Sequence, residues 1–469
     1  MKKMIFAAVT AAICSLSASA EGYQVNSLST KQLGMGHAGI GMKLGAESMF
    51  FNPAAVAYMD KTMDITGSFT AISSHIKATT PEGIEYKSDN PISTPIFFGT
   101  AFKIYDNLKA GVAFYTPYGS GVDYGDNWGA AVLNQNVKLR IYTVQPTLSW
   151  AINDKFSIGA GAMVSWGTVD LQKALVTAET ADRTIAVMKQ MGQLPAETPS
   201  FGETTPASIG LKGTAEVVVG FNVGAMYNIN KKISVGVNFR SKMEMHVKKG
   251  DASVLYANNL AQNMLGETLD LINNANFDAK MPCPWVLGFG VSYKPIDKLT
   301  LAFDAKLTGW KTYKTLNICF LDDNLTEFNQ HITKKYSNAW CYSLGAQYAL
   351  TSRFDLRAGM MIDTTPVNDK YYNPETPGMT KIEPTVGFSF RPIPEFSIDL
   401  GFMYTAGLGR DNASCEYNDL LGAKMIGQLQ AAGVPDQAIQ AMGFSATGKF
   451  TADYKVHAFL PSIGVSYKF

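Results

Sequence analysis

The stretch Phe156–Trp166, FSIGAGAMVSW, alternates between large or apolar side chains at even positions and mostly small or polar ones at odd positions. A period of two residues is that of a β-strand whose two faces have different surroundings. Here the apolar face is the bulkier one and the opposite face is rich in serine and glycine. This pattern is typical of a barrel strand with lipid outside and a lumen inside.

The same alternation recurs along the chain, in residues 217–228, 299–308, 396–404 and 462–469. The charged residues Asp304, Lys306 and Asp399 all fall on the inward-facing positions of these strands. The last strand ends at the aromatic Phe469, which resembles the signal that barrel assembly machinery recognises.

Turn signals allow the strands to be counted. Six short polar turns, near 106–107, 153–154, 230–231, 295–297, 351–353 and 392–395, alternate with seven longer segments. Together they predict an all-β, 14-stranded antiparallel transmembrane barrel over residues 61–469, with both chain ends on the periplasmic side. The longer segments, expected to be outer loops, are about 77–91, 119–135, 171–213, 248–280, 319–335, 364–380 and 408–447.

Residues 1–20 are expected to be a secretory signal peptide, with Lys2 and Lys3, an apolar stretch and a small-residue cleavage site. Removing it leaves 38 basic residues (40 minus 2) against 39 acidic ones, which gives no electrostatic argument for nucleic-acid binding. Beyond the signal there is no run of about 18 apolar residues, so no membrane helix is expected. Export, aromatic richness and many short alternating segments point to the outer membrane of a Gram-negative cell, and a monomer is expected.

Residues 21–60 lie before the first strand, are rich in glycine and contain Asn52-Pro53-Ala54. A segment without strand period in front of a barrel is expected to fold into the lumen as a plug. Its Gly34–Gly39 matches G-x-G-x-x-G but lacks the flanking strand and helix of a dinucleotide site. The glycines are instead expected to allow tight turns in a narrow lumen, and no cofactor or metal site is predicted.

Three outer loops carry helical periodicity, in 184–194, 260–272 and 420–442. One interpretation is that these helices pack together and cap the barrel. The other is that an apolar, methionine-rich surface receives hydrophobic ligands. The candidate residues for this landing surface are Met188, Met191, Leu260, Met264 and Leu269.

With these features the chain resembles the FadL family of outer-membrane transporters for long-chain fatty acids and other hydrophobic compounds. The resemblance rests on the plug with Asn52-Pro53-Ala54, the strand number, the helical third and fourth loops and the terminal Phe469. Gly22–Asn26 is similar to that family's mature start, and Asp363–Val367 to the end of its eleventh strand.

The resemblance implies passive transport with a lateral exit. A ligand lands on the third and fourth loops, enters a pocket beside the N-terminal segment, and leaves into membrane lipid through a kink in the third strand. Pro117, Tyr118 and Gly119 are the candidate kink, although Pro117 also fits a simple strand end. Lys173 and Lys314 are the candidate cations for a ligand head group, while the family's second basic position falls on Asn317.

Other functions stay open at this point. A lipid-cleaving barrel would need a serine–histidine pair, but the five histidines are scattered and match no catalytic motif. An adhesin or scaffold and a porin for polar solutes are further alternatives, and the porin is disfavoured by the plug. The mature cysteines match no metal motif, and Cys319 and Cys341 are a candidate disulfide because they flank one outer loop.

Overall fold

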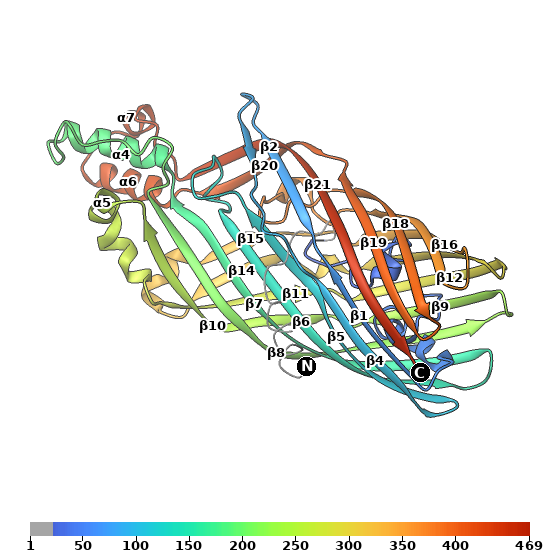
Figure 1. Cartoon of the computed structure of the whole chain (residues 1–469). Helices are drawn as coiled ribbons and strands as arrows, with labels where there is room; N and C mark the ends of the chain where they lie inside the picture. Colours follow the sequence, from blue (N-terminus) through green and yellow to red (C-terminus); the bar gives the residue numbers. More distant parts are fainter. Residues whose placement is uncertain (1–21) are drawn as a thin grey trace, which may run out of the picture.

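A computed structural model describes residues 22–469, so the expected signal peptide lies outside the described part of the chain. The chain forms a closed 14-stranded antiparallel barrel, which confirms the predicted fold (Figure 1). The last strand pairs with the first, in register from Asp64–Lys468 to Thr70–Ser462, and this pairing closes the barrel.

Several wall strands are split by short breaks, so more β-segments than wall strands are distinguished. They are β1 (Met63–Thr70), β2 (Ser73–Thr79), β3 (Glu85–Lys87), β4 (Ile96–Tyr105), β5 (Leu108–Asp123), β6 (Asn136–Ala151), β7 (Phe156–Val176), β8 (Ala207–Asn228), β9 (Ile233–Arg240), β10 (Met243–Tyr256), β11 (Asn276–Cys283), β12 (Val286–Ile296), β13 (Leu299–Thr308), β14 (Thr315–Phe320), β15 (Gln330–Thr333), β16 (Ala339–Ala349), β17 (Phe354–Asp363), β18 (Lys381–Ile393), β19 (Phe396–Gly407), β20 (Arg410–Asn418) and β21 (Thr447–Lys468).

The predicted alternation of the wall is observed. In β13, Leu301 and Phe303 are exposed on the outside, whereas Asp304 and Lys306 are buried on the lumen side. The third predicted inward charge, Asp399, is also buried. The outer face is therefore apolar and the inner face polar, as a lipid-embedded wall requires.

The wall strands continue beyond the ends predicted from alternation. β7 extends to Val176 and β8 already begins at Ala207, so the third loop is shorter than the expected 171–213. β10 and β11 likewise extend into the expected fourth loop. The reason is that a strand rising above the membrane has water on its outer face, so it stays paired without keeping an apolar face.

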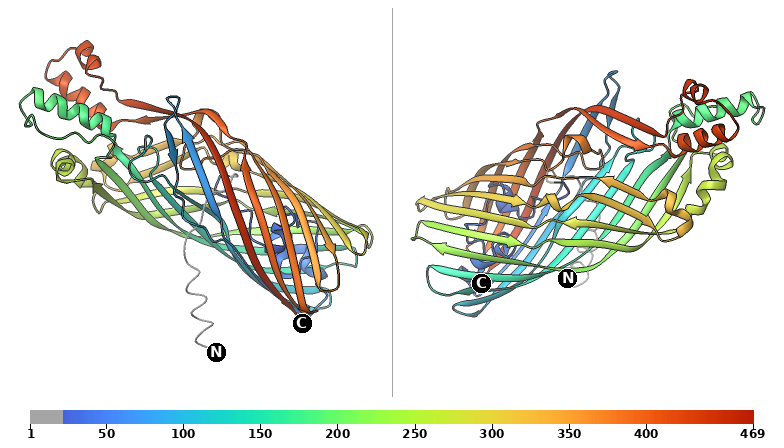
Figure 2. Two further views of the ribbon diagram at one scale, coloured as in Figure 1. Left: turned by 45° about the horizontal axis from the view of Figure 1, so that its top comes forward. Right: turned by 180° about the vertical axis from the view of Figure 1, so that it is seen from behind.

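Helices gather at the end of the barrel opposite the C-terminus (Figures 1 and 2). The loop helices are α4 (Ala178–Gln190), α5 (Asn259–Leu269), η3 (Asp270–Ile272), α6 (Leu420–Ala431) and α7 (Asp436–Ala441), and shorter 3-10 turns are η4 (Trp310–Thr312), η5 (Asp323–Phe328) and η6 (Asp369–Tyr371). All three predicted helical loops therefore contain helix. No helix among residues 22–469 has the length and apolar character needed to cross a membrane.

The N-terminal segment lies inside the barrel, in the half that holds the C-terminus (Figure 2, left). Its elements are α2 (Thr30–Leu33), η1 (Gly45–Glu47), α3 (Ser48–Phe51) and η2 (Pro53–Tyr58). Almost all of its side chains are buried against the inner wall. We call residues 22–60 the plug.

The expected disulfide between Cys319 and Cys341 is wrong, because all four cysteines of the described chain are free. Cys341 lies in β16 within the barrel wall, opposite Lys306 of β13. Cys319 lies in β14, which pairs instead with β11. The two residues flank the loop in sequence but belong to different parts of the wall.

Candidate ligand cavity and plug

Asn52 fastens the plug to itself and to the wall. Its amide nitrogen donates to the carbonyl oxygens of Ile40, at 3.0 Å, and of Ala225 in β8, at 3.1 Å. Its side-chain oxygen accepts from the backbone N–H of Ala54 at 3.1 Å and caps η2. The Asn-Pro-Ala sequence therefore combines a helix cap with a bond to the barrel.

Wall side chains satisfy the carbonyl groups of the plug. The Met49 carbonyl accepts from Gln145, at 2.7 Å, and from Asn222, at 2.9 Å. The Ala54 carbonyl accepts from the hydroxyls of Ser149, at 3.1 Å, and Ser157, at 2.9 Å. Buried backbone groups need such partners, so this polar inner face fits the plug.

Two glycines of the wall give the plug room. A Cβ atom on Gly224 would lie 2.1 Å from the side-chain oxygen of Asn52, and one on Gly159 would lie 2.4 Å from the carbonyl carbon of Pro53. Any larger residue at either position would push the Asn52–Pro53 turn away from the wall. The Asn52–Pro53 turn and the wall at these two glycines are thus complementary in shape.

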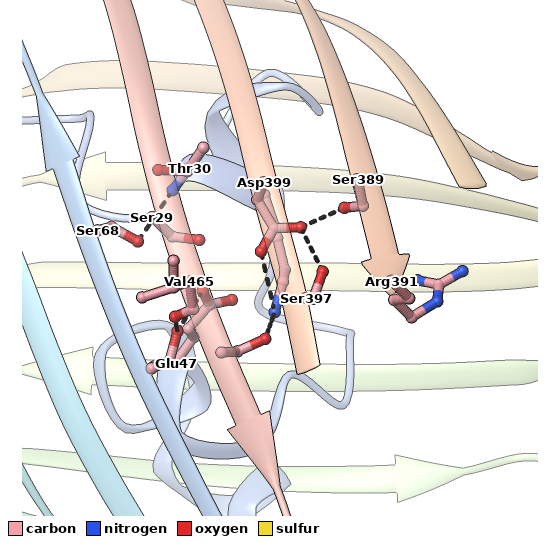
Figure 3. A network of polar contacts seen from close by, with 12 residues as sticks. Ser29, Thr30, Glu47, Ser68, Ser389, Arg391, Ser397, Asp399 and Val465 are labelled. Atoms are coloured by element: carbon pink, nitrogen blue, oxygen red, sulfur yellow. Dashed lines mark hydrogen bonds and ion pairs between the residues drawn. The ribbon is translucent and has the colours of Figure 1, made fainter. Parts of the chain in front are cut away.

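Charged contacts fasten the plug on its other side (Figure 3). Lys31 donates to Ser466 of β21 at 2.8 Å and lies 3.6 Å from the carboxylate of Asp399 in β19. The Thr30 and Ser462 hydroxyls are 2.6 Å apart. The first helix of the plug is therefore bonded to β19 and β21, beside the β1–β21 pairing that closes the barrel.

His37 is buried in the plug between Phe50 and Phe51 and has a left-handed φ of 60°. Neither ring nitrogen has a hydrogen-bond partner among the described residues. Burial, together with the positive charges of Lys306 and Arg240, lowers the pKa of His37 well below its ordinary value. The imidazole is therefore neutral at physiological pH.

An apolar cavity of about 90 Å³ lies beside the plug, in the half of the barrel nearer the loops. Its lining comes from β5 to β8, β10, β11 and β14, and includes Tyr23, Leu139, Val169, Met245, Phe277 and Ile318. Its mostly hydrocarbon walls suit a small hydrophobic molecule rather than a polar one. We call this space the apolar cavity.

Tyr23 lies at the boundary between the apolar cavity and the third wall strand, β5. Its ring packs edge-on against Trp310, with centroids 4.8 Å apart, and its hydroxyl donates to the Pro282 carbonyl. The backbone beside it pairs with β5, because Gly119 N–H donates to the Tyr23 carbonyl at 2.8 Å and Val25 N–H donates to the Pro117 carbonyl at 2.9 Å. The start of the plug therefore occupies the place of a neighbouring strand.

The three candidate kink residues lie at this contact. The register of β5 against β6 shifts between Tyr115 and Tyr118, because an advance of three residues along β5 corresponds to an advance of only two along β6. Pro117 does not end the strand, which continues to Asp123. The bulge therefore lies at Thr116 and Pro117, directly before Tyr118 and Gly119, and the plug is hydrogen-bonded to the backbone at Pro117 and Gly119.

The candidate head-group cations do not meet at the apolar cavity. Lys173 lines a separate hollow of about 730 Å³ among the outer loops, whose lining is part polar and part apolar. Lys314 is exposed, although it has the same sequence parity as the inward-facing Lys306, because η4 breaks the strand between them and resets the alternation. Tyr313 takes the inward position instead and lines the cavity.

Sequence reasoning missed a buried ion pair at the cavity. Lys334 is fully buried and is paired with Glu375, and Glu375 also lines the apolar cavity. The two residues lie 41 positions apart on different outer segments, and neither has a motif around it. No sequence signal could have joined them.

The predicted landing residues do not form one patch of loops three and four alone. On α4, Met188 is half-buried and Met191 is exposed; on α5, Leu260 and Met264 are half-buried and Leu269 is buried. Helix α6 of the seventh loop contacts α4, and its Lys424 donates to Thr268 of α5 at 2.5 Å. The helical cap thus has three loops in it.

Two of the five histidines, His75 and His457, lie together, and the other three lie elsewhere. Ser73 and His75 are 3.2 Å apart, on the exposed part of β2. His75 stacks on His457, whereas His246 contacts Asp278 on the other side of the barrel. This arrangement has none of the buried, oriented geometry of a catalytic pair.

Comparison with known proteins identifies relatives over nearly the whole chain. It is 22% identical over 416 residues to outer membrane protein P1 of Haemophilus influenzae, covering 83% of this chain and 87% of that protein. It is 21% identical to the long-chain fatty acid transport protein of Escherichia coli K12, with 85% and 91% covered.

Solved structures share the fold. A FadL homologue from Pseudomonas aeruginosa superposes with a TM-score of 0.76 at 18% identity, covering 96% of this chain and 100% of that chain. The toluene transporter TodX of Pseudomonas putida superposes with a TM-score of 0.66 at 15% identity, with 96% and 99% covered.

The model of one protein family matches residues 11–469, and that family is described as outer membrane protein transport protein (OMPP1/FadL/TodX). This match covers far more than half of the chain and includes both the plug and the complete barrel. It places the protein among transport proteins rather than enzymes, in the outer membrane of a Gram-negative cell. The chain belongs to the OMPP1/FadL/TodX family of outer-membrane transport proteins.

Proposed function

We propose that the protein carries hydrophobic small molecules, such as long-chain fatty acids, passively across the outer membrane. The observation that carries the proposal is the apolar cavity, which is bounded by Tyr23 of the plug. The ligand is captured by the helical cap, passes to this cavity, and leaves sideways at the candidate kink of Pro117, Tyr118 and Gly119 when residues 22–27 shift.

A lateral exit suits such a ligand. Moving an alkyl chain through a water-filled pore exposes it at a cost of roughly 0.8 kcal/mol per CH2 group. Leaving through the wall keeps the chain in an apolar environment throughout. The plug below the cavity is bonded to the wall at Asn52, Met49 and Ala54, so a straight path to the periplasm is filled.

The test is uptake of labelled oleate by cells with and without the protein. Deleting residues 21–27, or replacing Pro117 and Gly119 with valine, is expected to bring uptake near the level of cells lacking the protein. Barrel assembly is checked by heat-modifiable migration in the outer-membrane fraction. Normal uptake by correctly assembled variants would remove the gating and the third-strand exit.

A second candidate ligand class is uncharged hydrocarbons, favoured by Glu375 in the cavity lining. Glu375 is already paired with Lys334, so this pair offers no free cation to a fatty-acid carboxylate, whereas toluene needs none. Uptake of labelled toluene with no uptake of oleate would assign the protein to uncharged ligands.

A further inference from the structure

Backbone pairing in the wall is interrupted at a second place, between the sixth wall strand, β8, and the seventh, β9–β10. β8 pairs with β9 through Asn222–Asn228 and with β10 through Ala207–Lys212. Ser241 N–H still donates to the Phe221 carbonyl at 2.9 Å, but residues 213–220 of β8 and 242–250 of β9–β10 belong to neither ladder. We call this unpaired stretch the β8–β10 seam.

Both strands bulge at the seam. The register of β7 with β8 shifts between Ser165 and Gly167, and that of β10 with β11 shifts between Val247 and Gly250. A bulge bends a strand and removes residues from its ladder. Two bulges facing each other therefore interrupt the backbone bonding that closes a barrel wall.

Side chains close the seam instead. A Cβ atom on Gly213 would lie 2.4 Å from a methyl group of Val247, so the valine fills the space that the glycine leaves. On the outside, Glu216 of β8 and Lys248 of β10 form an exposed ion pair at 2.8 Å. Such contacts separate more readily than a continuous ladder.

The apolar cavity lies directly behind the seam. Ala215 from one side and Met245 and Val247 from the other are buried and line the cavity. Two further lining residues, Thr168 on β7 and Lys280 on β11, are exposed and flank the seam. One layer of side chains therefore separates the cavity from the exterior.

The outer surface indicates the level of the seam in the membrane. Val217 and Val219 of β8 are 64% and 68% exposed and lie on the lipid-facing side. The next residue toward the outer loops is the charged Glu216. On the neighbouring β7, Trp166 stacks with Tyr142, as aromatic side chains do at a membrane interface. The seam thus spans the outer boundary of the lipid band.

We propose that the β8–β10 seam is a second lateral opening, through which an uncharged apolar ligand passes between the cavity and the outer leaflet. The proposal rests on the proposed transport function. It differs from the third-strand bulge in what closes the wall. There the plug supplies backbone hydrogen bonds to Pro117 and Gly119, whereas the seam has side-chain contacts.

A disulfide across the seam tests the proposal. The Cβ atom built on Gly213 lies 3.6 Å from Cβ of Val247, within the range that a disulfide spans. The variant is G213C/V247C in a chain whose native cysteines are replaced by alanine. The matched control is G210C/S253C, which joins the same strands at residues that are already paired in the ladder.

Cells carrying each variant are oxidised, assayed with labelled toluene and labelled oleate, then reduced and assayed again. We expect oxidation of G213C/V247C to lower toluene uptake roughly tenfold and reduction to restore it, with the oxidised control unaffected. Restoration by reduction shows that the protein is folded. Purified G213C/V247C should bind toluene equally well when oxidised and when reduced, because the two states have the same substituted cavity lining and differ only in the disulfide.

Undiminished toluene uptake by the oxidised seam variant would overturn the second opening and leave the transport function standing. Loss of toluene binding together with uptake would also overturn it, since the disulfide would then act on the cavity. If the unmodified protein takes up neither probe, the transport proposal itself fails and the opening fails with it.

Discussion

Replacing Asn52 with alanine is expected to loosen the plug without unfolding the barrel. The side chain makes three hydrogen bonds, to Ile40, Ala54 and Ala225, at 3.0 to 3.1 Å. A typical buried hydrogen bond contributes about 1 kcal/mol net, so their loss removes about 3 kcal/mol from the free energy that holds the plug in place. Each 1.4 kcal/mol corresponds to about a factor of ten, so local opening becomes about a hundredfold more frequent.

Amide hydrogen exchange in detergent micelles measures this opening. Exchange at Ala54 and Ala55 should accelerate by about two orders of magnitude in the Asn52→Ala protein, while strand amides keep their protection. The matched control is Asn90→Ala. That side chain also makes three hydrogen bonds, but to Ser74 and Asp123 in the outer part of the barrel.

The reasoning is refuted if plug amides of Asn52→Ala exchange at the wild-type rate. It is equally refuted if Asn90→Ala accelerates them as much, because the effect would then not arise from contacts of the plug. A loss of strand protection in the Asn52 variant would show that the plug stabilises the whole barrel.

Three further perturbations follow from the same contacts. Gly224→Ala would place a Cβ atom 2.1 Å from the side-chain oxygen of Asn52, so it should displace Asn52 and accelerate exchange of the plug amides. Gly67→Ala should not, because the nearest atom to its Cβ is 3.8 Å away. Burial lowers the pKa of His37, so its neutral form stabilises the plug above the unfolded pKa of about 6.5. Protection of the plug amides should therefore fall as pH drops below that value, and His37→Asn should reduce this fall. Lys334→Met leaves Glu375 buried without its partner and should lower the free energy of unfolding by about 3 to 5 kcal/mol in a denaturant titration, unless it is combined with Glu375→Gln.

The sequence predicts the barrel well because one physical rule covers most of it. Lipid on one side and a polar lumen on the other impose a two-residue period, and Asp304, Lys306 and Asp399 follow it. The rule stops at the membrane boundary, where both faces meet polar surroundings. This is why β7 ends later, and β8 begins earlier, than the alternation predicts.

The site is predicted less completely, for two reasons. Breaks reset the alternation, so counting from Lys306 across the η4 turn assigns Lys314 to the wrong face. Contacts between distant loops, such as Lys334 with Glu375, leave no local pattern. The β8–β10 seam left a weak trace, since Val217, Val218 and Val219 break the alternation where β8 bulges.

The contacts of the plug are unevenly distributed, and this distribution bears on how transport and sealing coexist. From Thr30 to Ala54 the plug is bonded to strands all around the lumen. Around Tyr23 it is held by two backbone bonds to β5, by the bond from the Tyr23 hydroxyl to the Pro282 carbonyl and by ring packing. Movement is therefore expected at the first residues, beside the cavity, while the rest stays in place. An apolar ligand would then pass through the wall while the lumen below remains filled and closed to polar solutes.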